Sequence, residues 1–492
     1  MNPLKKLASQ TAIYGIPSIA GRFLFFLLTY LYTRVFSTGQ FGINSEFYAY
    51  SGFFTVLLAF GMETGFFRFH KDAKDPLKVY STTLNFIIGT SSLFLVLIYL
   101  YAQPIADILK YPDHVEYIKW FGWMLALDAV CAIPFVKLRA ENRAAWFATV
   151  KVLEIALNFS LNVFFLIICR KAYLQNPDSF LASLYNPAIG VGYIFIANLA
   201  ASAFKMVLLL PQFRGALNGF DKELFSKLLR YSLPMVLIGF AGIINEMLDR
   251  MILKYTLPYD TATNLAQLGI YSACYKISII MSLFIQAYRF AAEPFFFAQS
   301  NKENAKRIYA DVLKYFTIFC VFIFLLVMLY LHWFQYFIGK EFRVGLKVVP
   351  ILLIANLCLG IYTNLSIWYK LTDRTLLGAF VSLSGAALTV ILNLLFIPTY
   401  GYMASAWATL ACYGSMALAS YALGQKYYPV NYDLKKIGGF IALGIGLWLV
   451  FEKVTEISGV SRNWTATLFM VIFLGLVYLT EVRSTKKPAQ SL

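Results

Sequence analysis

Apolar stretches of about 20 residues recur along the whole chain, and short polar joints separate them. A helix rises about 1.5 Å per residue, so about 20 apolar residues cross the roughly 30 Å hydrocarbon core of a bilayer. The pattern predicts an all-α polytopic membrane protein with about 14 transmembrane helices. The expected spans are residues 10–33, 44–67, 79–103, 114–136, 146–169, 186–210, 231–255, 268–297, 310–333, 346–369, 375–398, 402–423, 436–451 and 464–480.

Lysines and arginines are distributed unevenly between alternate joints. If the chain starts inside, the inner joints together with Lys5 and Lys6 carry 25 basic residues, and the outer joints carry ten. Short loops rich in Lys and Arg remain in the cytoplasm. The asymmetry therefore predicts an even number of spans, with both termini on the cytoplasmic side.

Composition excludes several classes of function. The chain is 60% hydrophobic and 14% charged, whereas a soluble domain is about 25% charged. Its net charge is +17, and the basic residues are concentrated in alternate joints. The charge therefore indicates membrane topology and contact with membrane lipids rather than nucleic acid. Six separate cysteines and three scattered histidines predict no metal site. No phosphate loop or hydrolase motif occurs, so we expect no cofactor and no built-in ATP hydrolysis.

A faint internal repeat divides the first twelve spans. Spans one and seven begin with Tyr-Gly-Ile-Pro at Tyr14 and Tyr-Ser-Leu-Pro at Tyr231, and a Gly-Ile pair opens each following span, at Gly42 and Gly269. Transporters often place a substrate path between two such repeats. The sequence predicts an N-lobe over residues 1–215, a C-lobe over 216–425, and a two-helix appendage with a tail over 426–492.

Charged residues inside the spans are the candidates for function, because an unpaired charge at mid-bilayer costs at least about 2.5–3.5 kcal/mol. In the first half they are Arg22, Glu63, Asp128 and Lys205, with Lys151 and Glu154 opening span five. Arg22 lies near the middle of span one. It either lines a substrate cavity or forms an ion pair with Glu63 that holds two helices together.

The second half carries a similar set. Glu246, Asp249 and Arg250 share one face of span seven, where they either pair within the helix or snorkel to the outer surface. Lys276 and Arg289 share a face of span eight, and Glu293 follows one turn later. This stripe either lines a water-filled lumen or lies partly at the inner interface.

Several segments resemble bacterial polysaccharide flippases of the Wzx type, in an order that covers most of the chain. These segments are residues 7–15 (LASQTAIYG), 30–36 (YLYTRVF), 61–69 (GMETGFFRF), 133–141 (IPFVKLRAE) and 269–276 (GIYSACYK). The resemblance implies membership of the multidrug/oligosaccharidyl-lipid/polysaccharide exporter (MOP) superfamily. It implies two six-helix lobes with two extra C-terminal helices, working by alternating access in the bacterial inner membrane.

The resemblance also implies a substrate and its site. The substrate would be a polyprenyl-diphosphate-linked oligosaccharide, such as an O-antigen unit for lipopolysaccharide, moved to the outer leaflet with possible H⁺ or Na⁺ coupling and polysaccharide polymerase or assembly partners. The implied cationic cavity comprises Arg22, Arg68, Arg250, Lys276 and Arg289. Coupling or ion-pair candidates are Glu63, Asp128, Glu246, Asp249 and Glu293.

Two alternative functions remain open. A multidrug antiporter of the same fold would rely on acidic lumen residues such as Glu63, Asp128 or Glu246. A membrane glycan polymerase or ligase would carry a large outer loop, and no joint exceeds about 20 residues. We therefore expect a transporter rather than an enzyme.

Overall fold

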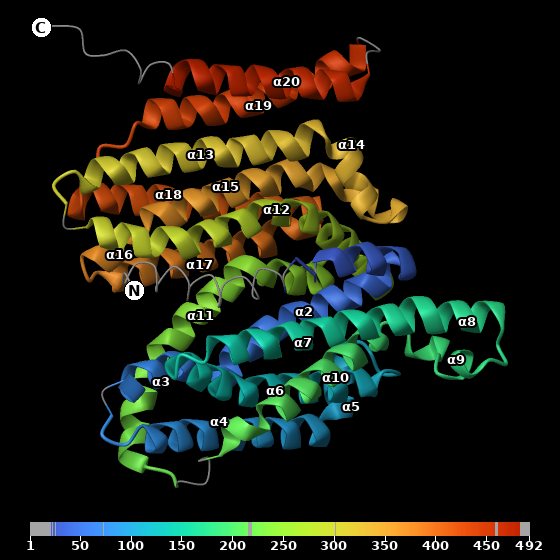
Figure 1. The fold of residues 1–492 in the computed structure, drawn as a ribbon. Coiled ribbons are helices and arrows are strands. Elements are labelled where there is room, and N and C mark those ends of the chain that lie inside the picture. The colour runs from blue at the N-terminus through green and yellow to red at the C-terminus, as the bar shows by residue number, and fades with distance from the viewer. Residues whose placement is uncertain are drawn as a thin grey trace, which may run out of the picture. The chain divides into compact units, whose positions relative to one another are not determined.

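The computed structural model describes residues 21, 23, 24, 26–71, 73–214, 219–300, 302–457 and 461–482. Over these residues the chain is helical, with short connections and no strand (Figure 1). Residues 26–35 are helical and include the end of the first expected span. Most of the rest of that span, including Arg22, lies outside the described residues.

The first half of the described chain runs from α2 to α11. Its elements are α2 (Thr38–Ala59), α3 (Met62–Lys71), α4 (Pro76–Leu100), α5 (Ala102–Ile108), α6 (Val115–Ala140), α7 (Ala144–Val163), the π-helix η1 (Phe164–Cys169), α8 (Arg170–Gln175), α9 (Phe180–Ser183), η2 (Pro187–Ile189), α10 (Gly192–Leu209), η3 (Leu210–Phe213) and α11 (Lys222–Thr256).

The second half runs from α12 to the C-terminal end of the described chain. Its elements are α12 (Thr261–Gln299), α13 (Ala305–Leu329), α14 (Leu331–Phe334), η4 (Gln335–Phe337), η5 (Lys340–Val348), α15 (Val349–Leu365), α16 (Ile367–Leu371), α17 (Thr375–Tyr400), α18 (Tyr402–Tyr427), α19 (Leu434–Ile457), α20 (Arg462–Val477) and the π-helix η6 (Tyr478–Val482).

The helices coincide with the expected spans, which confirms a polytopic all-α membrane protein. Twelve segments of the described chain are long and apolar enough to cross a bilayer. The expected span at 402–423 coincides with α18, which has 26 residues but is less apolar than those twelve. The remaining expected span, the first, lies largely outside the described residues.

The early starts of α11 and α12 and the break in the second expected span have local causes. α11 and α12 start nine and seven residues before their windows, because Asp221 and Asp260 accept hydrogen bonds from the backbone N–H groups of the first turns. The second expected span breaks into α2 and α3 at Phe60 and Gly61, both of which have positive φ. A Cβ on Gly61 would lie 2.7 Å from the Ser232 carbonyl oxygen of α11, so this position requires glycine.

By packing, the chain forms two compact units, and each is described by itself. The first comprises residues 1–272 and 390–402, and the second comprises 273–389 and 403–492. In the first unit, α6 packs against α4 and α10, and α10 packs against α7. In the second, α13 packs against α15 and α19, and α19 pairs with α20. Both units bury polar side chains among these helices.

Candidate functional site

In the first unit, the charged residues expected in spans four to six meet in one cluster. Lys205 of α10 is only 4% exposed, and its ammonium donates to Asp128 of α6 and to Glu154 of α7, each at 2.6 Å. The hydroxyl of Ser202 donates to the same Asp128 oxygen at 2.5 Å. Lys151 holds the other Glu154 oxygen at 3.1 Å. The cluster therefore balances two carboxylates against two ammonium groups, as burial demands.

A polar seam extends this cluster along α7 and α10. On α7, Glu154, Asn158 and Asn162 follow at intervals of four residues, so they lie on one face of the helix. The Asn158 amide donates to Asn198 of α10 at 2.8 Å, and Asn162 accepts a hydrogen bond from Tyr32 at 2.9 Å. The seam thus connects a charged centre to neutral hydrogen-bonding groups through the interior of the unit.

Glu63 and Arg68 lie on α3, which follows the break at Gly61. Glu63 is exposed, and its carboxylate interacts electrostatically with the positive charges of Arg139 and Lys151. Arg68 is also exposed, with its guanidinium 5.7 Å from the centre of the Tyr231 ring. The predicted Arg22–Glu63 pair stays a prediction, because Arg22 is outside the described residues.

The acidic and basic residues of α11 occupy two different environments. Glu246 is exposed and forms no ion pair with any described residue. Asp249 and Arg250 are buried rather than snorkelling to the surface. Asp249 accepts a hydrogen bond from Tyr271 at 2.5 Å and another from the Arg250 backbone N–H at 2.8 Å. Arg250 donates to the Glu246 backbone carbonyl at 3.3 Å.

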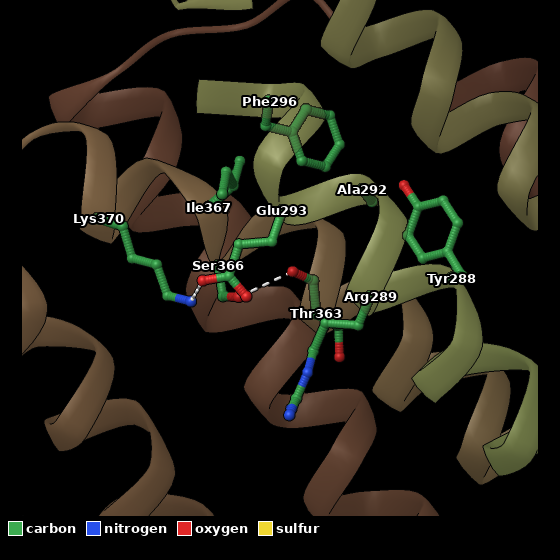
Figure 2. A pocket seen from close by; sticks show the side chains of 9 residues that line it. All are labelled: Tyr288, Arg289, Ala292, Glu293, Phe296, Thr363, Ser366, Ile367 and Lys370. Atoms are coloured by element: carbon green, nitrogen blue, oxygen red, sulfur yellow. Dashed lines mark hydrogen bonds and ion pairs between the residues drawn. The ribbon is translucent and has the colours of Figure 1, made fainter. Parts of the chain in front are cut away.

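The second unit contains a pocket between α12 and the α15–α16 segment. The hollow is shallow and open: counted together with the solvent space in its mouth it measures about 320 Å³. Figure 2 shows its lining. The lining residues are Tyr288, Arg289, Ala292, Glu293, Phe296, Thr363, Ser366, Ile367 and Lys370.

The apolar wall of this pocket is fixed by the core. Ala292 and Phe296 of α12 pack with Ile367 of α16 and with Tyr309 of α13, whose hydroxyl donates to the Phe296 carbonyl at 3.0 Å. These buried contacts set the spacing between α12 and α16. The charged side chains of the pocket are therefore carried by helices that are held in place.

The polar side of the pocket contains two cations and one carboxylate. Lys370 forms an ion pair with Glu293, and Arg289 extends away from this pair (Figure 2). Arg289 is exposed and forms no ion pair within the described chain. The hydroxyls of Thr363 and Ser366 donate to backbone carbonyls. The charged donors available to a bound anion are therefore Lys370 and Arg289. Lys276, on the same helix, does not line the pocket.

Several of these residues were not identified from the sequence. The sequence pattern indicates neither Lys370 nor the amides of Asn158, Asn162 and Asn198 as site residues. A search for polar residues at four-residue intervals would have found the α7 set. The partners of Lys370 could not be found in this way, because α12 and α16 are far apart in sequence.

Comparisons with known proteins agree with this architecture. A family model described as "Polysaccharide biosynthesis protein" matches residues 7–299, which is more than half of the chain. No protein in the curated set matches. Among solved structures, the lipid II flippase MurJ in an inward closed conformation has a TM-score of 0.72 at 14% identity. That match covers 95% of this chain and 99% of the flippase.

Multidrug transporters share the same fold. An inward-facing multidrug resistance transporter of the MATE family, from the MOP superfamily, has a TM-score of 0.65 at 12% identity, covering 87% of this chain and 95% of the transporter. The Vibrio cholerae MATE transporter VcmN in its bent form has a TM-score of 0.52 at 14% identity, covering 89% and 99%. The fold is thus that of MOP-superfamily flippases and transporters, and the chain belongs to the polysaccharide biosynthesis protein family.

Proposed function

We propose that this protein is a flippase that moves polyprenyl-diphosphate-linked oligosaccharide from the inner to the outer leaflet of a bacterial inner membrane. The observation that carries the proposal is the α12–α16 pocket, in which Arg289 and Lys370 stand beside an apolar wall. A lipid diphosphate needs cationic donors for its oxygens, and arginine offers a two-pronged donor. Family membership supports the glycan part of the substrate.

Glu293 gives this pocket a way to bind and release an anion. Its carboxylate forms an ion pair with the Lys370 ammonium. An arriving phosphate oxygen would replace that carboxylate, so the lysine exchanges one partner for another and is never left unpaired. Binding is then strong enough to select an anion yet reversible, because the displaced pair re-forms on release. Further proposed contacts with the substrate along its path are Arg22, Arg68, Arg250 and Lys276.

The same pocket argues against a cationic drug as substrate. Two positive side chains would repel it, and the one carboxylate is already paired. The structural likeness to MATE transporters concerns the fold only. A multidrug antiporter remains the alternative that binding measurements distinguish.

Binding of a short-chain polyprenyl diphosphate to the purified full-length protein tests the proposal. We expect Arg289→Ala and Lys370→Ala each to weaken binding about ten- to a hundred-fold, the value of one charge-assisted hydrogen bond. Lys306→Ala is the matched control, because Lys306 lies over the Tyr428 ring and outside the pocket. Unchanged binding in both pocket variants, or tighter binding of a cationic drug than of the diphosphate, would overturn it.

A further inference from the structure

A buried ion pair, Glu46–Lys254, joins α2 to α11 on the predicted outer side. We propose that Glu46 and Lys254 form a latch, which closes the outer side of the protein and opens in each transport cycle. The inference rests on the proposed function, because it assigns the pair a place in alternating access. Its physical basis is independent of the substrate.

The ion pair is completely enclosed. Both side chains are 0% exposed, and the Lys254 ammonium donates to the two Glu46 oxygens at 3.0 and 2.8 Å. Its third hydrogen bond goes to the backbone carbonyl of Leu109, which follows α5, at 2.6 Å. An ammonium has three N–H donors, so Lys254 is fully satisfied. The pair therefore joins three segments at one point.

Three tyrosines complete the surroundings of the carboxylate. Tyr111 donates to one Glu46 oxygen at 2.5 Å, while Tyr50 at 2.8 Å and Tyr255 at 3.2 Å donate to the other. The Lys254 ammonium also lies 4.0 Å from the centre of the Tyr111 ring. Every polar group of the pair thus has a partner, and all of these partners lie in the first packing unit.

The location of the pair makes it a connection between the two sequence repeats. α2 belongs to the first repeat, and residues 222–272 belong to the second, yet both pack in the first unit. On α2, the residues Gly42, Ser45, Glu46 and Ala49 are buried at helical spacing, so they form one stripe. The outer parts of the two repeats are joined along this stripe.

An ion pair suits a contact that must separate. Two charges lose hydration when they are buried, and replacing such a pair with apolar residues of similar size often stabilises the closed form. When the outer side opens, water returns to both ions and offsets much of the lost attraction. An apolar contact has no such compensation. The pair thus makes the closed state specific without making it permanent.

Removing one partner and replacing both should have opposite effects. Lys254→Met leaves the Glu46 carboxylate buried without its cation, which favours the open state. Glu46→Gln combined with Lys254→Met keeps an amide for the tyrosines and removes both charges, which favours the closed state. Ser45→Cys in the buried stripe provides the reporter, since a membrane-impermeant maleimide reaches it only when the outer side opens. Each variant is compared with the same chain lacking Ser45→Cys, to subtract labelling of the native cysteines.

We expect Lys254→Met to raise the labelling rate of Cys at position 45 at least about tenfold, and the double variant to lower it below that of the wild type and to stop transport. Should Lys254→Met not reach the membrane, the double variant, which has no buried charge, still decides the question. The exposed pair Lys453–Glu456 supplies the control: Lys453→Met with Glu456→Gln should change neither quantity.

Equal labelling in wild type and double variant, together with normal transport, would overturn the latch. The labelling needs no substrate. Opposite shifts in the two variants, in a protein that moves no lipid-linked oligosaccharide, would support the latch and overturn the proposed function instead.

Discussion

Gly42 of α2 and Gly269 of α12 lie against each other, and each faces the carbonyl of the residue four positions before its partner. A Cβ on Gly42 would lie 2.0 Å from the Leu265 carbonyl oxygen, and a Cβ on Gly269 would lie 1.9 Å from that of Thr38. The two glycines open equivalent spans in the sequence repeat. The contact is therefore nearly symmetric, and it brings two helix backbones as close as small residues allow.

This crossing predicts that neither glycine tolerates a methyl group. Gly42→Ala or Gly269→Ala should each destabilise the protein by about 1–3 kcal/mol, because the added carbon meets rigid backbone. The double variant should cost less than the sum of the two, since one displacement relieves both clashes. Thermal unfolding in detergent measures the effect. Gly89→Ala in α4 is the control, because no atom beyond the adjacent backbone of its own helix lies within 4 Å of that Cβ; an equal loss there would contradict the prediction.

The Lys205 cluster predicts a loss that further substitutions reverse. Lys205→Met should destabilise the first unit by about 1–3 kcal/mol, because Glu154 loses the buried ammonium beside it, while Asp128 is 39% exposed and keeps part of its hydration. Adding Asp128→Asn and Glu154→Gln removes the unpaired charges and should restore most of the stability. Melting temperatures of the three proteins check this, with transport measured in parallel.

A stable triple variant that still transports would leave the cluster a structural role. A stable triple variant that does not transport would support the predicted coupling role of Asp128. If Lys205→Met alone melts like the wild type, the burial argument is wrong.

Arg22 is predicted from the sequence to bind substrate, and two variants separate this from a structural role. Arg22→Ala should block surface polysaccharide while the protein stays abundant in the membrane. If Arg22 only pairs with Glu63, Arg22→Ala combined with Glu63→Ala should restore export, since no unpaired charge remains. Export and membrane abundance are measured together. Normal export by Arg22→Ala alone would exclude the substrate role.

The start of α11 predicts a dependence of stability on pH. The Leu224 backbone N–H bonds to Asp221, which lies 3.4 Å from Lys78, and these contacts hold the pKa of Asp221 below its usual 3.8. A lowered folded-state pKa means that the contribution is present above the usual value and is lost as pH falls through the folded one. Asp221→Asn keeps the cap but cannot titrate. The wild type should therefore melt above Asp221→Asn at pH 7. The difference should begin to shrink only below about pH 4 and vanish once the pH lies below the lowered pKa of Asp221.

The number of spans and the class of protein followed from the sequence because bilayer thickness fixes the length of a crossing helix. The ends of the helices could not be predicted from hydropathy. Asp221 and Asp260 extend α11 and α12 past the apolar windows, because a capped helix continues into the polar boundary, where hydropathy carries no signal. The Gly-Ile pairs were visible in the sequence as part of an internal repeat, but the contact between Gly42 and Gly269 was not.

The same distinction between local pattern and tertiary packing applies to the charged residues of the sites. The sequence alone identified Lys205, Asp128 and Glu154 as charges inside the membrane, since a charge in an apolar window stands out at once. It did not single out Glu46, Lys254 or Lys370. Only the tertiary structure decided their partners: Lys205 with Asp128 and Glu154, Lys370 with Glu293, and Lys254 with Glu46. Glu46 and Lys254 are 208 residues apart. Helical spacing relates residues within one turn or two, whereas pairing between helices depends on which faces pack together, and no local pattern records that choice.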